Sequence, residues 1–114
     1  GLAINKTVSD IQAAKAQAIH SQVSFHEQSV SLQITANTAI NDEVLLLSFN
    51  HPLEDQQDID IHLKHTGSGQ YQADMPAITP GKWYLTLQSL DTARPWRINT
   101  TAFLPGTTID MNAE

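Results

Sequence analysis

The stretch Gly81-Lys82-Trp83-Tyr84-Leu85-Thr86-Leu87 holds one of the chain's two tryptophans within a regular alternation of apolar and polar residues. Trp83, Leu85 and Leu87 share one face of a strand, because successive side chains of a strand point to opposite sides. The turn signal Pro80-Gly81 comes just before this alternation. The stretch therefore predicts a β-strand with one buried face, and it places Trp83 in the core.

The same two-residue period recurs on both sides of this stretch, over residues 22–103. Trp96 opens the last predicted strand, and Tyr71 is in phase with Ala73 in an earlier one. About seven short strands separated by turn signals, after one helical segment, predict a mainly β fold. We expect an immunoglobulin-like antiparallel β-sandwich of about seven strands with one N-terminal α-helix. A small barrel is the alternative arrangement. The predicted core residues are Trp83, Leu85, Leu87, Trp96 and Tyr71.

The two ends of the chain lack this alternation. Residues 3–19 carry apolar side chains at three- and four-residue steps with alanines between them, which predicts an amphipathic helix. Residues 105–114 show no period, and we expect a disordered tail there. The predicted organisation is an amphipathic helix over 1–20, a β-sandwich domain over 21–104 and a tail over 105–114.

Composition limits the classes of function. The chain has 114 residues, which corresponds to one domain, and its 6 Lys and Arg face 12 Asp and Glu, for a formal charge of -6. This acidic balance argues against nucleic acid and anionic lipid as partners. Because there is no cysteine, disulfides, thiolate catalysis and cysteine-based zinc sites are excluded.

Histidine and methionine are the remaining side chains suited to a soft metal ion such as copper. The weak candidates for ligands are His51, His62, His65 and Met75. His62 and His65 are three residues apart, so a strand places them on opposite faces. Met75 is in phase with Tyr71, which indicates a core position, and His51 ends an apolar run, where its ring can bond to loop backbone. We expect no metal site and no cofactor, with copper held by distant loops as the alternative.

Motifs for catalysis are absent from the sequence. Gly67-Ser68-Gly69 is too short for a phosphate-binding loop, and no serine lies in a nucleophile-elbow pattern. The acidic stretch that contains Glu54, Asp55, Asp58 and Asp60 lacks the glycine and the spacing of a calcium loop, so a solvated loop is the simpler interpretation. We therefore predict no catalytic or cofactor-binding residue, and we do not expect an enzyme.

The order of several short motifs resembles the FixH family, also called CcoH. The resemblance covers nearly the whole chain to about Thr100, and the ordered set is more specific than any one member. The motifs are Gly1-Leu2-Ala3-Ile4-Asn5-Lys6, His51-Pro52, Asp58, Gly69-Gln70-Tyr71, Gly81-Lys82-Trp83-Tyr84-Leu85-Thr86-Leu87 and Trp96-Arg97-Ile98.

The resemblance implies a location and a role. In that family a single transmembrane helix precedes a periplasmic domain, and the proteins are associated with assembly or stability of the cbb(3)-type haem-copper cytochrome c oxidase, together with a copper-transporting ATPase. We expect a non-enzymatic domain at the periplasmic face of the bacterial inner membrane, which contacts oxidase subunits and is held by an N-terminal anchor absent from this chain. The start at Gly1 without Met fits the loss of an upstream segment. A copper-binding periplasmic chaperone is the alternative.

Overall fold

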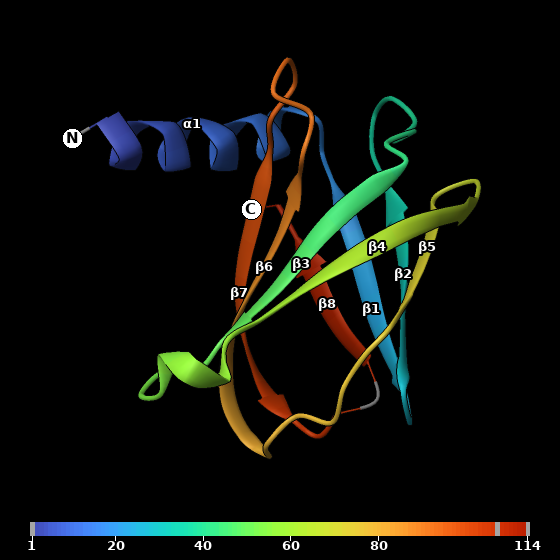
Figure 1. Cartoon of the computed structure of the whole chain (residues 1–114). Coiled ribbons are helices and arrows are strands. Elements are labelled where there is room, and N and C mark those ends of the chain that lie inside the picture. Colours follow the sequence, from blue (N-terminus) through green and yellow to red (C-terminus); the bar gives the residue numbers. More distant parts are fainter. Residues whose placement is uncertain (1, 107, 114) are drawn as a thin grey trace.

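The computed structural model describes residues 2–106 and 108–113, with side chains from Asn5 onward. Within these residues the chain forms one α-helix, one short 3-10 helix and eight β-strands (Figure 1). In chain order the elements are α1 (Leu2–Ala16), β1 (His20–His26), β2 (Ser29–Thr35), β3 (Val44–Asn50), η1 (Asp55–Gln57), β4 (Ile59–Gly67), β5 (Gln70–Asp74), β6 (Gly81–Ser89), β7 (Arg97–Leu104) and β8 (Thr108–Asn112).

The strands form one antiparallel sheet in the order β7-β6-β3-β4-β5-β2-β1-β8. The prediction of a mainly β fold with one helix is confirmed, with eight strands in the described residues where about seven were expected. The hairpin of β4 and β5 joins the two halves of the sheet, because β4 pairs with β3 and β5 pairs with β2. A register shift between His65 and Gly67 interrupts the pairing of β4 with β5, and such irregularities bend a strand.

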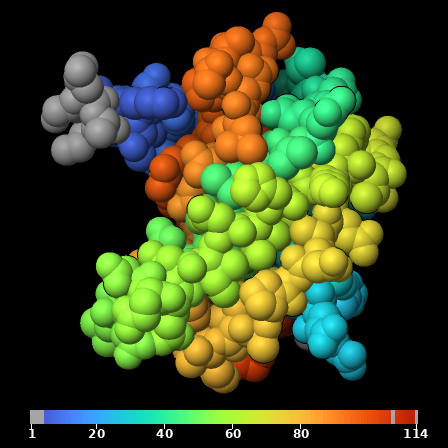
Figure 2. Space-filling model, in the orientation of Figure 1, coloured from blue at the N-terminus to red at the C-terminus, as the bar shows by residue number. Residues whose placement is uncertain are grey.

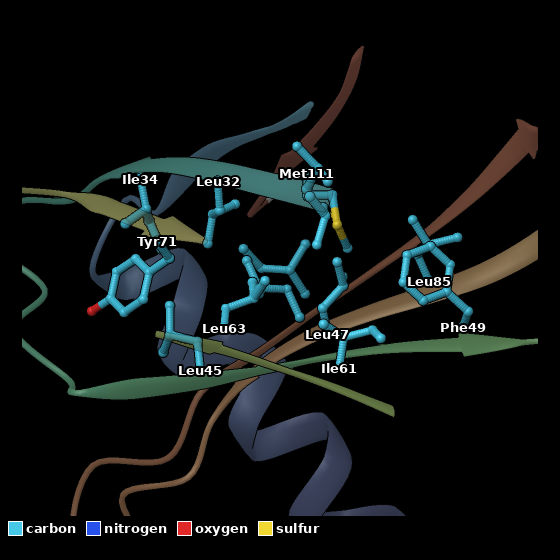
Figure 3. Packing of buried hydrophobic residues seen from close by; sticks show 14 of the residues in the cluster. Leu32, Ile34, Leu45, Leu47, Phe49, Ile61, Leu63, Tyr71, Leu85 and Met111 are labelled. Carbon is cyan, nitrogen blue, oxygen red and sulfur yellow. The ribbon is translucent and has the colours of Figure 1, made fainter. Parts of the chain in front are cut away.

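The sheet folds over so that its two halves face each other across a common core. Phe25 of β1 and Phe49 of β3 lie far apart in the strand order, yet their rings meet edge to face with centroids 6.1 Å apart. Figure 3 shows Leu32 and Met111 on one side of the core and Leu47 and Ile61 on the other. The continuous hydrogen bonding is that of an incomplete barrel, whereas the packing of opposite halves is that of a sandwich.

All five residues predicted for the core are buried. Trp83, Leu85, Leu87, Trp96 and Tyr71 are each at most 2% exposed. β3 lies between β6 and β4 and adds Leu45, Leu47 and Phe49, which are fully buried. Burial of large apolar side chains is the main favourable term in folding, so this central strand contributes strongly to stability.

The helix is shorter than predicted, because α1 ends at Ala16 and not at Ile19. The N–H of Ile19 donates to the carbonyl of Ala14 at 3.2 Å, and the N–H of Ala18 donates to that of Lys15 at 3.0 Å. These two bonds, with Ala18 at a φ of 52°, form a Schellman motif that stops the helix. Glycine usually marks this left-handed position, so the alanine gave no sign of it in the sequence.

The expectation of a disordered tail is wrong for residues 108–112. They form β8, which pairs with β1 at the edge of the sheet, with Met111 fully buried. The Ser21 hydroxyl donates to the Met111 carbonyl at 2.5 Å, and the Asn112 side-chain oxygen accepts from the Ser21 N–H at 3.1 Å. The apolar alternation here has only two members, Ile109 and Met111, which is why the strand was missed.

The helix and the segment that contains η1 lie at opposite ends of the molecule. α1 extends sideways from one end of the sheet and contacts β7 (Figure 1). Ala14 is fully buried in this contact, whereas Val8, nearer the free end of α1, is 48% exposed. Figure 2 shows the green segment around residues 51–58 as a separate lobe remote from the blue helix.

Replacement of Trp83 by alanine tests the core. The side chain is 1% exposed, and its indole N–H donates to the Thr79 carbonyl at 2.8 Å. We expect Trp83→Ala to lower the free energy of unfolding by about 3–5 kcal/mol, measured by urea denaturation. Phe103→Ala is the control, because Phe103 is 73% exposed and its loss should change stability by less than about 0.5 kcal/mol. Equal effects of the two substitutions would contradict the placement of Trp83 in the core.

Candidate functional site

A groove of about 1040 Å³ lies beside α1. One wall is the face of α1 that carries Ser9, Asp10, Ala13 and Gln17, and the other walls are residues 38–44 and the segment from Leu90 to Trp96. We call it the α1 groove. For comparison, the hollow over β4 and β5 has a volume of about 460 Å³. A hollow of this size is in the range of sites that receive several side chains of a ligand or partner.

The wall formed by residues 38–44 is fastened to the sheet. The Tyr71 hydroxyl donates to the Asp42 carbonyl at 2.6 Å, and the His65 N–H donates to the Glu43 carbonyl at 3.0 Å. Ile40 is buried against the core. The segment joins β2 to β3 without regular structure, and these contacts explain how it keeps a defined position.

The wall formed by residues 90–96 is linked to the wall formed by residues 38–44 through hydrogen bonds of the Ser89 hydroxyl. The Ser89 hydroxyl donates to Oδ2 of Asp42 at 2.7 Å and accepts the N–H of Asp91 at 3.0 Å. Oδ1 of Asp91 in turn accepts the N–H of Ala93 at 2.9 Å. Trp96 is buried at the base of this segment. The side chains of Asp42 and Asp91 are therefore held in place before any partner arrives.

The α1 groove is acidic. Four carboxylates line it, those of Asp10, Asp42, Glu43 and Asp91, with one guanidinium, that of Arg94, so the formal charges sum to -3. Asp10 is paired with Lys6 at 2.8 Å, and this is the one ion pair found in the described part of the chain. Sequence analysis did not identify this site, because its carboxylates come from a helix and two loops that look unrelated in the sequence.

Burial raises the pKa of Tyr71 from its ordinary value of 10.0 to about 12, and the charge of Asp42 adds to the rise. The phenol is 1% exposed and packs face to face with the His65 ring, with centroids 4.8 Å apart and an angle of 22° between the planes. Tyr71 therefore stays protonated at neutral pH, and its hydroxyl remains a donor to the wall of the groove.

His51, the first metal candidate, has a role in the loop. Its Nδ1 accepts the N–H groups of Leu53 and Glu54, both at 3.1 Å, so the neutral ring carries its proton on Nε2. The ring meets Trp83 edge to face with centroids 5.0 Å apart, and the His51 N–H donates to Asp58 at 2.8 Å. The prediction that His51 bonds to loop backbone is confirmed. The resemblance motifs at 51, 58 and 83 thus meet at one end of the sheet.

The structure does not bring the four metal candidates together. His62 is exposed on β4, whereas His65 stacks on Tyr71 and its Nε2 is buried without a hydrogen-bond partner among the described residues. His51 lies level with the start of β4, roughly 20 Å along the strand from His65. Met75 is partly buried against the core. No group of three or more His, Asp or Glu side chains able to hold a metal ion occurs in residues 2–106 and 108–113.

Two glycines in the motifs that resemble the FixH family occupy backbone positions that require glycine. Gly69 has a φ of +64°, and a Cβ there would lie 2.5 Å from the Ile34 carbonyl oxygen. The same close approach lets the Ile34 N–H donate to the Gly69 carbonyl at 2.8 Å. Gly81 has a φ of +134° at the start of β6, a conformation that other residues rarely adopt. Both motifs therefore stabilise the fold.

Fold and site together define a small β-domain with one projecting helix and an acidic groove beside that helix. Comparison with known families identifies the family within this class. The sequence model of the FixH family matches residues 1–103, and the chain belongs to the FixH family. No curated protein and no solved structure matches the chain. In the residues that the structure describes, no helix has the length and apolar character needed to cross a membrane.

Raised pH tests the burial of Tyr71. Below pH 10 this phenol is protonated in the folded and unfolded states alike, whereas between pH 10 and about 12 it ionises only in the unfolded state. We therefore expect the free energy of unfolding to fall as the pH rises through this window. In Tyr71→Phe the fall should be smaller, although the loss of the hydroxyl lowers stability at neutral pH by about 1 kcal/mol. Urea melts of both proteins at stepped pH values give the comparison, and parallel pH profiles would contradict the assignment.

Substitution of His51 tests the loop contacts. His51→Ala removes an acceptor of two backbone N–H groups and the ring contact with Trp83. We expect the free energy of unfolding to drop by about 1–2 kcal/mol. His62→Ala is the matched control, since His62 is exposed and should cost less than about 0.5 kcal/mol. Thermal melts followed by tryptophan fluorescence give both values, and a larger loss for His62 would refute this account of His51.

Proposed function

We propose that this protein is a non-enzymatic, membrane-anchored periplasmic protein that aids assembly or stability of a cbb(3)-type haem-copper cytochrome c oxidase by direct protein contact. Membership of the FixH family over residues 1–103 carries this proposal. The family is not known as an enzyme family. Its association with this oxidase supplies the partner, and the bacterial inner membrane is the compartment in which the two would meet.

The structure supports a role by contact more than a role in chemistry. Carboxylates outnumber the other ionisable side chains of the α1 groove, which also holds one guanidinium and uncharged polar side chains. The Ser89 and Tyr71 hydroxyls, which support its walls, are engaged as donors to Asp42. The histidines lie elsewhere, with His51 bonded to its own loop and His65 stacked on Tyr71. An acidic groove whose walls are held by hydrogen bonds is suited to recognition of a partner surface.

Tethering explains how such a small domain acts. A protein held at the membrane next to its partner meets it at a raised effective concentration, so weak contacts suffice. The 114-residue domain alone should then bind the oxidase weakly, whereas the anchored form should copurify with it. The net charge of -6 should speed encounter with a basic periplasmic surface at low salt.

Complementation tests this function. In a strain that lacks the natural protein, a form with a transmembrane helix ahead of Gly1 should restore cbb(3)-type oxidase activity, while a secreted form without that helix should not. Equal periplasmic amounts of both forms, checked by immunoblot, are the control. Full rescue by the secreted form would show that tethering is unnecessary and would favour a diffusible metal carrier. Failure of the anchored form to restore activity would refute the proposed function.

A further inference from the structure

We infer that the α1 groove is the contact surface and that it receives a basic segment of a partner protein. In this arrangement lysine or arginine side chains of the segment bind the carboxylates of Asp42, Glu43 and Asp91, and a neighbouring apolar side chain packs against Leu90 and Pro95. The inference rests on the proposed function, because it names the surface and the partner chemistry through which that function is carried out.

The carboxylates are arranged for an incoming cation. Asp42 uses Oδ2 to accept from Ser89, and Asp91 uses Oδ1 to accept from Ala93, so each keeps a second oxygen with no bond to another described residue. A carboxylate that is already oriented loses little conformational entropy when it binds a guanidinium or ammonium group. Charge-assisted bonds of this kind are stronger than those between neutral groups.

The charge in the groove favours a cationic occupant. Asp10 is paired with Lys6, but Asp42, Glu43 and Asp91 have no ion-pair partner in the part of the chain that the structure describes. Arg94 is the one cation among the described lining residues, so the excess of negative charge remains. Complementary potentials speed encounter and exclude partners of like charge. An anionic lipid surface or nucleic acid would be repelled, and a second copy would present the same acidic rim.

Apolar surface in the groove indicates a protein segment and not a small cation. Leu90 is 47% exposed at the rim, and the groove also includes the partly exposed side chains of Ala13 and Pro95. Interfaces commonly combine an apolar centre with a charged, solvated rim. A segment with a basic side chain next to an apolar one satisfies both parts, whereas a metal ion or a free amine leaves the apolar part uncovered.

The walls of the groove are rigid enough to recognise such a segment. Asp42 is held by its carbonyl to Tyr71 and by its carboxylate to Ser89, and Ser89 also binds Asp91. Both walls thus depend on side chains of β5 and β6 within the sheet. Binding to a preformed surface needs little rearrangement and loses less affinity than binding to a mobile loop.

A pair of matched triple variants tests the inference. Asp42→Asn with Glu43→Gln and Asp91→Asn removes three charges from the groove while leaving oxygen acceptors for Ser89 and Ala93. Glu27→Gln with Glu54→Gln and Asp55→Asn removes the same charge from exposed residues outside it. If the groove triple variant does not fold, Leu90→Lys replaces it, since this exposed residue can carry a repelling charge without loss of core packing.

The first measurement uses the isolated chain and a short peptide of alternating lysine and leucine as probe. Amide shifts in NMR spectra should concentrate on residues 38–44, 90–96 and the groove face of α1, and affinity should fall about tenfold in the groove variant but less than about twofold in the control. A peptide of alternating glutamate and leucine should not bind. Shifts centred on residues 51–58, or equal losses in both variants, would overturn the inference.

The second measurement separates this inference from the proposed function. The anchored wild type, groove variant and control variant are compared for copurified oxidase and restored oxidase activity. We expect about tenfold less copurified oxidase for the groove variant and near wild-type recovery for the control. If all three restore activity and copurify equally, the groove inference fails while the proposed function stands. If even the wild type restores nothing, the proposed function fails, and the peptide experiment alone then decides whether the groove binds basic segments.

Discussion

The hairpin of β4 and β5 is the constraint on which the rest of the structure depends. Each half of the sheet has one apolar face, and neither half can bury that face alone. β4 belongs to the half with β3, β6 and β7, and β5 belongs to the half with β2, β1 and β8. The hairpin therefore joins the two halves both through the chain and through the hydrogen bonds between β4 and β5. The interruption of pairing after His65 lies within this hairpin, where the two halves meet.

This same hairpin connects the core to the α1 groove. Tyr71 of β5 packs its ring in the interior and extends its hydroxyl to the Asp42 carbonyl, and His65 of β4 binds the next carbonyl through its backbone. Asp42 then reaches Ser89 at the end of β6. A loop that would otherwise be mobile is thereby positioned by buried strands. The high pKa of Tyr71 reflects this position, because the phenol must be buried for its hydroxyl to hold the wall.

Alternation of apolar residues predicts strands and faces, but it does not identify the strands that pair. Trp83, Leu85 and Leu87 were placed correctly because a face depends only on local sequence. Whether the strands form two sheets or one depends on the partners of β4 and β5, which are set by contacts far apart in the chain. Ala18 and Met111 show a further limit: an alanine at a left-handed cap and a strand with two apolar residues carry signals too weak to recognise alone.

The α1 groove could not be predicted from the sequence, because it too depends on contacts between distant parts of the chain. Its carboxylates come from three segments that are separated by tens of residues, and only the fold brings Asp42 beside Ser89 and Asp91. By contrast, His51 and Trp83, which stand out in the sequence, contact each other, and His51 Nδ1 and the Trp83 indole N–H both bond to backbone within the domain. The end of the sheet that carries the resemblance motifs at 51, 58 and 83 is thus occupied by its own contacts. The other end leaves oriented carboxylates open to solvent, and this is the end from which α1 extends. If the protein is tethered as proposed, the chain that leads to the anchor and the surface that meets the partner would lie side by side, and the tether would raise the effective concentration of that surface near the partner.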